Sequence, residues 1–459
     1  MSHATDSLID LCLNTLPNRI GDVEITAAKK CLVDSLATAL AAYGEAPIDV
    51  LRSLSIEASP QGQSTVIAYG EKARPSDVAL VNGAMISLQL FDDNQAEMRG
   101  HPSGPLLPAV LAMAELKNLS VNEALKAFVI GYEVECRFGT ILNPSHYEMG
   151  WHATATQGTL AAVVASGIIL GLDNKKMANA LGIVASMTGG VRRNFGTMTM
   201  SLHSGIASSN GIKAAQLAEK GFTGDPHIFD GPMNMGSILS RDFSEELLEN
   251  NLSLWGDPFM IVSPGATFKL YPCGRPPLFA VDCALEIQRK HKIDPNNIKR
   301  IACDVSFLYP RTLIHTRPQN GLQAKASLQY CIATSLMDGR PTLASFTDEA
   351  VNRKSISDLI DLIEVRVPPH LSEDIPAVRK APFEQPVTLE VETKDGHVYS
   401  EIVHIHKGSP LNPVTDLDLK QKFLDCAGLH MNAEKSESIL SYLEKNDANV
   451  RELMKLVSI

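Results

Sequence analysis

An uncharged stretch of twenty residues, 153–172, does most to restrict what this chain can fold into. It is about long enough to span a bilayer. However, Thr154, Thr156 and Gln157 lie near its start, and many of its other residues are alanine or glycine, which suit close packing of helices. The stretch therefore predicts a buried core helix of a large globular domain, and we expect no membrane partner.

Helical periodicity continues through the first half of the chain and somewhat beyond. In residues 26–43, Leu32 and Leu36 lie on one side of the predicted helix. Ser120 begins another helix, because Ser-Val-Asn-Glu forms a capping box there. Alanine is abundant and strand-like alternation is rare. The sequence therefore predicts a large helical bundle in which small side chains let the helices approach closely.

The pattern changes near Ser263. Four prolines fall within fourteen residues after it, which breaks regular structure and indicates a crossing between domains. A helix at 278–291 is followed by strand patterns, and the turn Lys394-Asp395-Gly396 joins two of them into a hairpin. The predicted strands are residues 300–307, 364–367, 387–393 and 398–405.

A proline-containing loop at 407–413 ends this part, and two helices follow after Asp416. Because helical periodicity returns there, we expect these helices to pack against the first domain. The predicted fold class is mainly α with a smaller α+β domain. A large helical bundle domain comprises residues 1–263 and the C-terminal helices at 414–459, and an inserted α+β lid domain comprises residues 264–413.

Charge and cysteine usage exclude several classes of protein. The formal net charge is -11, and a diffuse acidic surface repels nucleic acid and anionic membranes. An anionic substrate would therefore need a local cluster of basic residues. Eight cysteines occur singly, which favours reduced thiols in the cytoplasm over a disulfide framework or a zinc site. The first residues show no signal-peptide pattern, which agrees with a cytoplasmic protein.

Common metal and cofactor motifs are absent from the sequence. It contains no H-E-x-x-H, no G-x-S-x-G, no Gly-Lys pair of a P-loop, and no G-x-G-x-x-G after a strand. We therefore expect no metal and no cofactor. These absences favour chemistry by side chains alone, namely proton transfer or elimination.

Four segments place polar residues where a helical core would normally be apolar. In the first, Asp92 and Asp93 precede His101, and charges placed so closely can set up an acid–base pair. In the second, His152 stands at the start of the uncharged helix, where the positive potential favours its neutral form and its use as a base. The simpler alternatives are helix capping by the aspartates and packing by the histidines.

The other two segments offer basic groups to a carboxylate. Arg192, Arg193 and His203 lie around a glycine-rich turn, whose backbone amides can help to hold an anion. Lys269 and Tyr271 lie at the predicted domain crossing, and clefts between domains are common ligand sites. The simpler alternatives are a packing loop and a surface lysine at a hinge.

In their order and spacing, these segments resemble the MmgE/PrpD family over nearly the whole chain. The motifs that carry the resemblance are FDDNQAEMRGHPSGPLLPAVLAMAE, GYEVECRFG, GWHATATQGT, ALGIVAS, GTMTMSLHSGIASSNG, GFTG, FKLYPCGRP, GLQAKASLQYCIA and GSPLNPVTDLDLKQKF. The family includes 2-methylcitrate dehydratases, cis-aconitate decarboxylases and iminodisuccinate epimerases. The resemblance implies a helical domain with an α+β lid, a homodimer, no cofactor and a small anionic carboxylate substrate. It also implies that Asp93, His101, His152 and Lys269 are site residues.

The chain departs from the family pattern at three positions. The family motif usually reads G-T-M-T-K-P-L-H, but Met200 and Ser201 occupy the lysine and proline positions here. Leu278 stands where a histidine is often found after Y-P-C-C-R. Methionine can neither carry a proton nor bind a carboxylate. We therefore expect weak activity on 2-methylcitrate and cis-aconitate.

The leading hypothesis is a cofactor-free lyase that dehydrates or decarboxylates a small di- or tricarboxylate. A histidine would transfer the proton, an aspartate would orient it or a substrate hydroxyl, and a lysine would bind a carboxylate. The residues assigned to catalysis are His101, His152, Asp93 and Lys269, and those assigned to substrate binding are Arg192, Arg193, His203 and Tyr271. Two alternatives stay open, an epimerase of a dicarboxylate such as iminodisuccinate and a non-catalytic carboxylate-binding member of the family.

Overall fold

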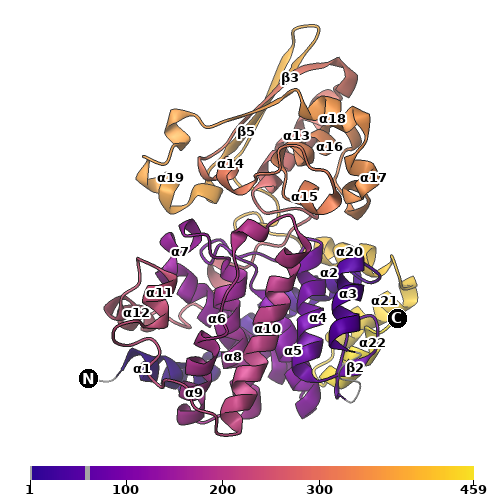
Figure 1. The fold of residues 1–459 in the computed structure, drawn as a ribbon. Helices are drawn as coiled ribbons and strands as arrows, with labels where there is room; N and C mark the ends of the chain where they lie inside the picture. Colours follow the sequence, from indigo (N-terminus) through magenta and orange to yellow (C-terminus); the bar gives the residue numbers. More distant parts are fainter. Residues whose placement is uncertain (1–2, 57–61) are drawn as a thin grey trace.

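The computed structural model describes residues 3–56 and 62–459, which form a helical domain and a smaller lid domain (Figure 1). The helices of the helical domain before the lid are α1 (Ala4–Asp10), α2 (Asp22–Leu40), α3 (Ala46–Ser55), α4 (Pro75–Leu88), α5 (Ser103–Lys117), α6 (Val121–Leu142), α7 (Ser145–Glu148), α8 (Ala153–Leu170), α9 (Asn174–Ala185), α10 (Met198–Glu219), α11 (Met235–Leu239) and α12 (Glu245–Leu252). A short antiparallel ribbon of β1 (Ser64–Thr65) and β2 (Lys72–Ala73), which the sequence did not predict, packs on α4.

Helix α8 lies in the middle of the helical domain and packs against α5, α6 and α10. Among the described residues it is the one helix long and apolar enough to cross a membrane, but 83% of that span is buried inside the protein. The prediction of a core helix is therefore confirmed. Small residues also allow α4 and α10 to approach closely, because a Cβ added to Gly205 would lie 2.1 Å from the carbonyl oxygen of Leu80.

The lid has its own hydrophobic core and a four-stranded mixed sheet in the order β4-β3-β5-β6. Strand β4 runs parallel to β3, whereas β5 runs antiparallel to both β3 and β6. The strands are β3 (Ile298–Asp304), β4 (Ile363–Arg366), β5 (Val387–Thr393) and β6 (Val398–Val403). The helices are α13 (Pro277–His291), α14 (Leu308–Thr312), α15 (Gly321–Lys325), α16 (Leu328–Asp338), α17 (Asp348–Val351), α18 (Lys354–Ile360) and α19 (Pro376–Lys380). The predicted fold class, mainly α with a smaller α+β domain, is confirmed.

The predicted strands are all present, with small shifts at their ends. The largest shift affects the strand predicted at 300–307, which begins at Ile298 and ends at Asp304. It ends early because α14 begins at Leu308, and the backbone N–H of Phe307 already donates to Leu371 outside the sheet. Apolar residues that precede a helix directly can therefore continue a strand pattern beyond the strand itself.

The chain crosses between the domains twice, and the two crossings lie side by side. The N–H of Phe268 in the first crossing donates to the carbonyl oxygen of Gly408 in the second (2.9 Å). Gly408 has a φ of 94°, and a Cβ there would lie 2.0 Å from the Phe268 oxygen, so the position needs glycine. After the second crossing, Phe423 and Leu453 belong to the core of the helical domain. The helices there are α20 (Asp416–Ala427), α21 (Ala433–Leu443) and α22 (Val450–Leu456).

Candidate active site

A cavity of about 90 Å³ lies at the junction of the two domains. Its walls come from the loop after α4, the starts of α8 and α10, the first crossing and the lid. The lining side chains with acid–base or charged groups are Asp92, Arg99, His101, Tyr147, His152 and Arg275, and Met200 lies in the same wall. The structure thus brings His101 and His152 together, as the sequence predicts, although they lie 51 positions apart.

The carboxylate of Asp92 lies against the imidazole ring of His101. Asp92 is fully buried, and its Oδ1 lies 3.2 Å from His101 Nδ1, while the backbone oxygen of Asp93 lies 3.0 Å from the same nitrogen. Both neighbours are acceptors, so Nδ1 carries a proton and Nε2 of the neutral ring is left as a base. Burial alone would raise the pKa of Asp92, but His101 and Lys269 outweigh it and hold that pKa below its usual range.

Lys269 lies behind Asp92 and does not line the cavity. Its buried ammonium group donates to the backbone oxygen of Leu90 (3.0 Å) and lies 3.8 Å from Asp92 Oδ1. Burial lowers the pKa of Lys269, and the charge of Asp92 opposes that shift. The structure therefore does not place Lys269 in the wall of this cavity, and its contact with a substrate carboxylate stays a prediction. Its geometry suits a different task, the neutralisation of Asp92 and the support of the loop after α4.

Asp93 faces away from the cavity. Its carboxyl group forms hydrogen bonds with the backbone N–H (3.2 Å) and the hydroxyl (2.8 Å) of Ser103 at the start of α5. In the structure, the carboxylate beside His101 is that of Asp92, whereas Asp93, predicted to orient a histidine, contacts Ser103. Burial, together with the charge of Asp34, raises the pKa of Asp93 to about 8, so this carboxyl group is largely protonated at neutral pH.

Asp93→Asn is expected to change how folding stability depends on pH. Because the pKa of Asp93 rises from 3.8 to about 8 on folding, the folded state keeps a proton that the unfolded state has released. The stabilising contribution is fully present below about pH 4 and is lost as the pH rises to about 8, by up to about 1.4 kcal/mol per pH unit. Asparagine does not titrate, so the variant should gain stability relative to the wild type over this range. Urea unfolding at several pH values measures the difference, and parallel stability curves would contradict it.

His152, the second histidine of the cavity, is the N-cap residue of α8. Its Nδ1 lies 2.9 Å from Nδ1 of His203 on α10. Burial holds the pKa of His152 well below its usual range, and burial also lowers the pKa of His203. Both rings are therefore neutral at neutral pH, and one Nδ1 donates to the other. His203 does not line the cavity, so its contact with substrate stays a prediction, and its hydrogen bond with His152 couples the tautomers of the two rings.

Two arginines line the cavity that sequence analysis did not assign to the site. Arg99 lies on the loop before α5 and donates to the backbone oxygen of Lys380 in the lid (3.1 Å). Arg275 is almost fully buried and pairs with Glu384 of the lid (2.6 Å). Arginine binds carboxylates through two parallel hydrogen bonds. Arg99 and Arg275 together therefore supply the local positive charge that an acidic protein needs in order to bind an anion.

The other predicted binding residues lie outside the cavity. Arg192 donates to the backbone oxygen of Tyr147 (2.6 Å) and lies 3.6 Å from the centre of its ring. Arg193 is exposed to solvent. Tyr271 donates to Asp282 (2.9 Å) within the lid. Their contact with substrate therefore stays a prediction, and Arg192 supports the cavity indirectly, because Tyr147 is part of its wall.

Arg99→Met is expected to raise the KM for the substrate by about tenfold to hundredfold, because a hydrogen bond to a charged group contributes about 1.5–3 kcal/mol. Arg193→Met is a matched control, since it removes the same charge from an exposed position outside the cavity. Its KM should stay within about twofold of the wild type. Steady-state kinetics at one ionic strength compare the two variants, and equal KM values would argue against Arg99 as a binding residue.

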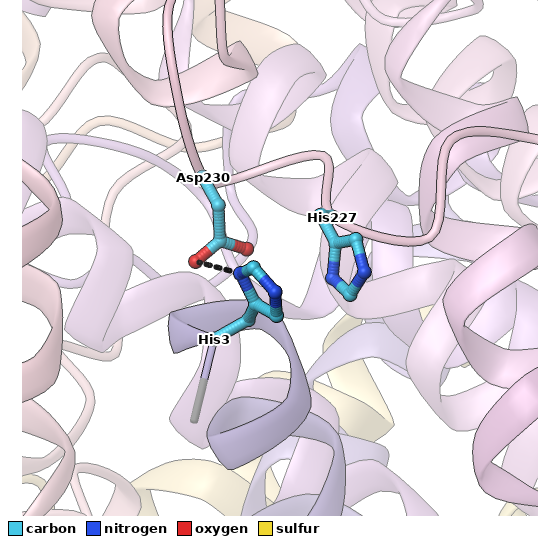
Figure 2. A group of neighbouring side chains, drawn as sticks. All are labelled: His3, His227 and Asp230. Atoms are coloured by element: carbon cyan, nitrogen blue, oxygen red, sulfur yellow. Dashed lines mark ion pairs between the residues drawn. The ribbon is translucent and has the colours of Figure 1, made fainter. Parts of the chain in front are cut away.

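One group of side chains within residues 3–56 and 62–459 has the composition of a metal site, namely His3, His227 and Asp230 (Figure 2). Asp230 already accepts hydrogen bonds from the backbone N–H groups of Ala4 (2.6 Å) and Thr5 (3.2 Å), and so caps α1. The two imidazole rings lie against each other, with centres 3.9 Å apart. The arrangement therefore suits a helix cap better than a chelate, and α1 lies at the side of the helical domain that faces away from the lid (Figure 1).

Two histidines, a buried carboxylate and two arginines thus lie around one cavity between the helical domain and the lid. The chain belongs to the MmgE/PrpD family. The MmgE/PrpD N-terminal domain matches residues 7–247, and the MmgE/PrpD C-terminal domain matches residues 271–448.

Three cis-aconitate decarboxylases are similar to the chain over most of its length. The cis-aconitate decarboxylase of Mus musculus is 27% identical over 461 residues, which cover 97% of this chain and 91% of that protein. The cis-aconitate decarboxylase of Homo sapiens is 27% identical over 437 residues, or 92% of this chain and 87% of that protein. The cis-aconitate decarboxylase of Aspergillus terreus is 26% identical over 382 residues, or 78% of this chain and 77% of that protein.

Proposed function

We propose that this protein is a lyase that removes water or carbon dioxide from a small di- or tricarboxylate by acid–base catalysis, without a metal or cofactor. The observation that carries the proposal is that two differently held histidines, His101 and His152, line one cavity with Arg99 and Arg275. Membership of the MmgE/PrpD family and similarity to three cis-aconitate decarboxylases support it.

Each part of the site has one task in this proposal. The arginines hold carboxylates of the substrate and orient it. In a dehydration, Nε2 of His101 removes the proton beside a carboxylate, and the positive ring of His101 then gives that proton to the hydroxyl group, which leaves as water, while neutral His152 forms a hydrogen bond with the substrate. In a decarboxylation, the bond to one carboxylate breaks, carbon dioxide leaves, and a histidine protonates the carbon that keeps the electron pair. In either reaction, Arg99 and Arg275 stabilise the negative charge that develops on the substrate.

A panel of di- and tricarboxylates, incubated with the protein in heavy water and followed by NMR and mass spectrometry, tests the proposal. The expected result is one substrate that loses the mass of water or of carbon dioxide. A decarboxylated product should also carry one solvent deuterium on the carbon that was protonated. Binding of citrate-like ligands without any product would contradict the proposal and favour a carboxylate-binding protein.

An epimerase of a dicarboxylate such as iminodisuccinate is a second candidate. The observation that favours it is that His101 and His152 have separate partners, Asp92 and His203, so each can carry a proton independently. An epimerase needs two such carriers on opposite faces of one carbon. Loss of stereochemical purity and uptake of deuterium, without loss of mass, would identify this activity in the same panel.

We also propose that the protein works as a cytoplasmic homodimer. The homodimer follows from the family resemblance, and the cytoplasm from the cysteines, which are all buried and free. Light scattering after size-exclusion chromatography measures the assembly, and a monomeric mass for active protein would contradict the homodimer.

A further inference from the structure

Lys422 contacts three separate parts of the chain, one of which is the loop after α4 that carries Asp92. It lies on α20, the helix that returns from the lid, and its side chain is almost completely buried. Its ammonium group donates to Asp34 on α2 (2.6 Å), to the backbone oxygen of Phe91 (2.5 Å) and to that of Lys269 (3.1 Å). It also lies 3.9 Å from the centre of the Phe91 ring. One side chain therefore fixes both the loop that carries Asp92 and the segment behind it.

The loop held in this way has a backbone conformation that needs support. Leu90 has a φ of 50°, in the left-handed region that L residues with large side chains rarely adopt. The carbonyl oxygen of Leu90 accepts from Lys269, and the next one, that of Phe91, accepts from Lys422. Asp92 follows directly. Lys269 and Lys422 thus hold the two carbonyl groups that directly precede Asp92 in the chain. The carboxylate of Asp92 in turn lies beside His101.

We propose that Lys422 is a positioning residue of the active site, which sets the distance between the carboxylate of Asp92 and His101. Lys422 does not line the cavity, so it acts through Asp92 and not on the substrate. The link from this distance to turnover rests on the proposed function. The distance itself is a property of the protein alone, and a measurement without substrate can follow it.

A purely structural role would have different consequences. Asp34 and Lys422 form a buried ion pair, and loss of one partner leaves an uncompensated charge that destabilises the fold. Neutral residues at both positions remove that penalty, but they do not restore the hydrogen bonds to Phe91 and Lys269. A double variant should therefore recover stability without recovering the position of Asp92.

The experiment compares Lys422→Met, Lys422→Arg and the double variant Asp34→Asn/Lys422→Met with Arg137→Met. Arg137 is a matched control, because it also pairs with a buried carboxylate, that of Glu133 (2.8 Å), and donates to two backbone oxygens away from the cavity. Urea unfolding measures stability. The nitrogen-15 chemical shift of His101 Nδ1, assigned with His101→Gln, reports the contact with the carboxylate. Values of kcat and KM are measured on the carboxylate of the panel that is turned over fastest.

In Lys422→Met and in the double variant, the His101 shift should move toward its value in an Asp92→Asn protein. The kcat should fall about tenfold or more, while KM changes by less than about threefold, because the arginines that bind substrate are untouched. The double variant should regain the stability that Lys422→Met loses. Lys422→Arg keeps the charge and the donors, so it should recover part of both the shift and kcat. Arg137→Met should lose stability and keep the wild-type shift and kcat.

An unchanged His101 shift in the double variant would overturn the positioning role, whatever the kinetics. Recovery of both stability and kcat in the double variant would also overturn it, because the role would then be structural. A moved shift with wild-type kcat would support the positioning role and contradict the catalytic role proposed for His101. If Lys422→Met does not fold, the double variant carries the test.

Discussion

Asp92→Asn is expected to lower kcat by about a hundredfold to ten-thousandfold, with little change in KM. The buried carboxylate, 3.2 Å from Nδ1 of His101, acts with the backbone oxygen of Asp93 to favour the tautomer that leaves Nε2 as the base. It also stabilises the positive ring that forms when Nε2 takes a proton. An asparagine amide can turn its NH₂ group toward Nδ1 and favour the wrong tautomer, and its neutral charge gives the positive ring much less support.

The neighbouring residue provides the control for this prediction. Asp93→Asn makes the same chemical change, but Asp93 contacts Ser103 and has a pKa of about 8, so its carboxyl group is already largely protonated. Its kcat should stay within about threefold of the wild type. Steady-state kinetics of both variants, with unfolding curves to confirm that they fold, decide the matter. A similar loss of kcat in both would show that the catalytic role does not belong to Asp92 alone.

The architecture of the protein was predictable because it depends on patterns within short segments. The uncharged run at 153–172 has too many polar and small residues for a membrane span, and it forms the core helix α8. Alternation at Val387, Leu389 and Val391 identifies β5, because successive side chains of a strand point to opposite faces. A local pattern of this kind persists whatever the rest of the chain does.

The detailed site was harder to predict, because it depends on the direction of single side chains. Asp92 and Asp93 are adjacent, and no sequence pattern shows which of them turns toward the cavity. That choice depends on the left-handed conformation of Leu90 and on Lys422, whose contact with Phe91 spans 331 residues of sequence. A motif thus identifies the neighbourhood of a site more reliably than the atoms that line it.

The arginines of the cavity show the same limit. Arg99 and Arg275 both lie inside motifs that carry the family resemblance, yet the sequence analysis assigned only Arg192 and Arg193 to anion binding. The difference arises from tertiary contacts. Arg192 stacks on Tyr147 outside the cavity, whereas contacts with the lid keep Arg99 and Arg275 in the cavity wall.

Met200→Lys is expected to raise turnover of cis-aconitate or 2-methylcitrate by about tenfold to hundredfold, through a new hydrogen bond from a charged group to a carboxylate. If the lysine also carries a proton, a further factor of about a hundred is expected. Met200 lies in the first turn of α10 and in the cavity wall, where the family motif usually has lysine. A thioether supplies neither charge nor proton, and a lysine of similar length reaches the same space.

Met198→Lys is the matched control for this substitution. Met198 begins the same helix, but its side chain is 53% exposed and lies outside the cavity. The control adds an equal charge to the protein, so a rise in both variants would reflect general attraction of the anionic substrate. Assays over a range of salt concentrations separate that effect from a direct contact, because general attraction weakens as salt is added.

Wild-type turnover equal to or above that of Met200→Lys on both substrates would show that the substitution is harmless. Arg192 and Arg193 do not line the cavity, so Arg99 and Arg275 would then be the cations that replace the lysine. That outcome would restore these two reactions as the favoured activities. A rise confined to Met200→Lys would show that the native substrate does without a cation at this position. The native substrate would then be expected to be a dicarboxylate, since a substrate with fewer negative charges needs fewer cations to hold it.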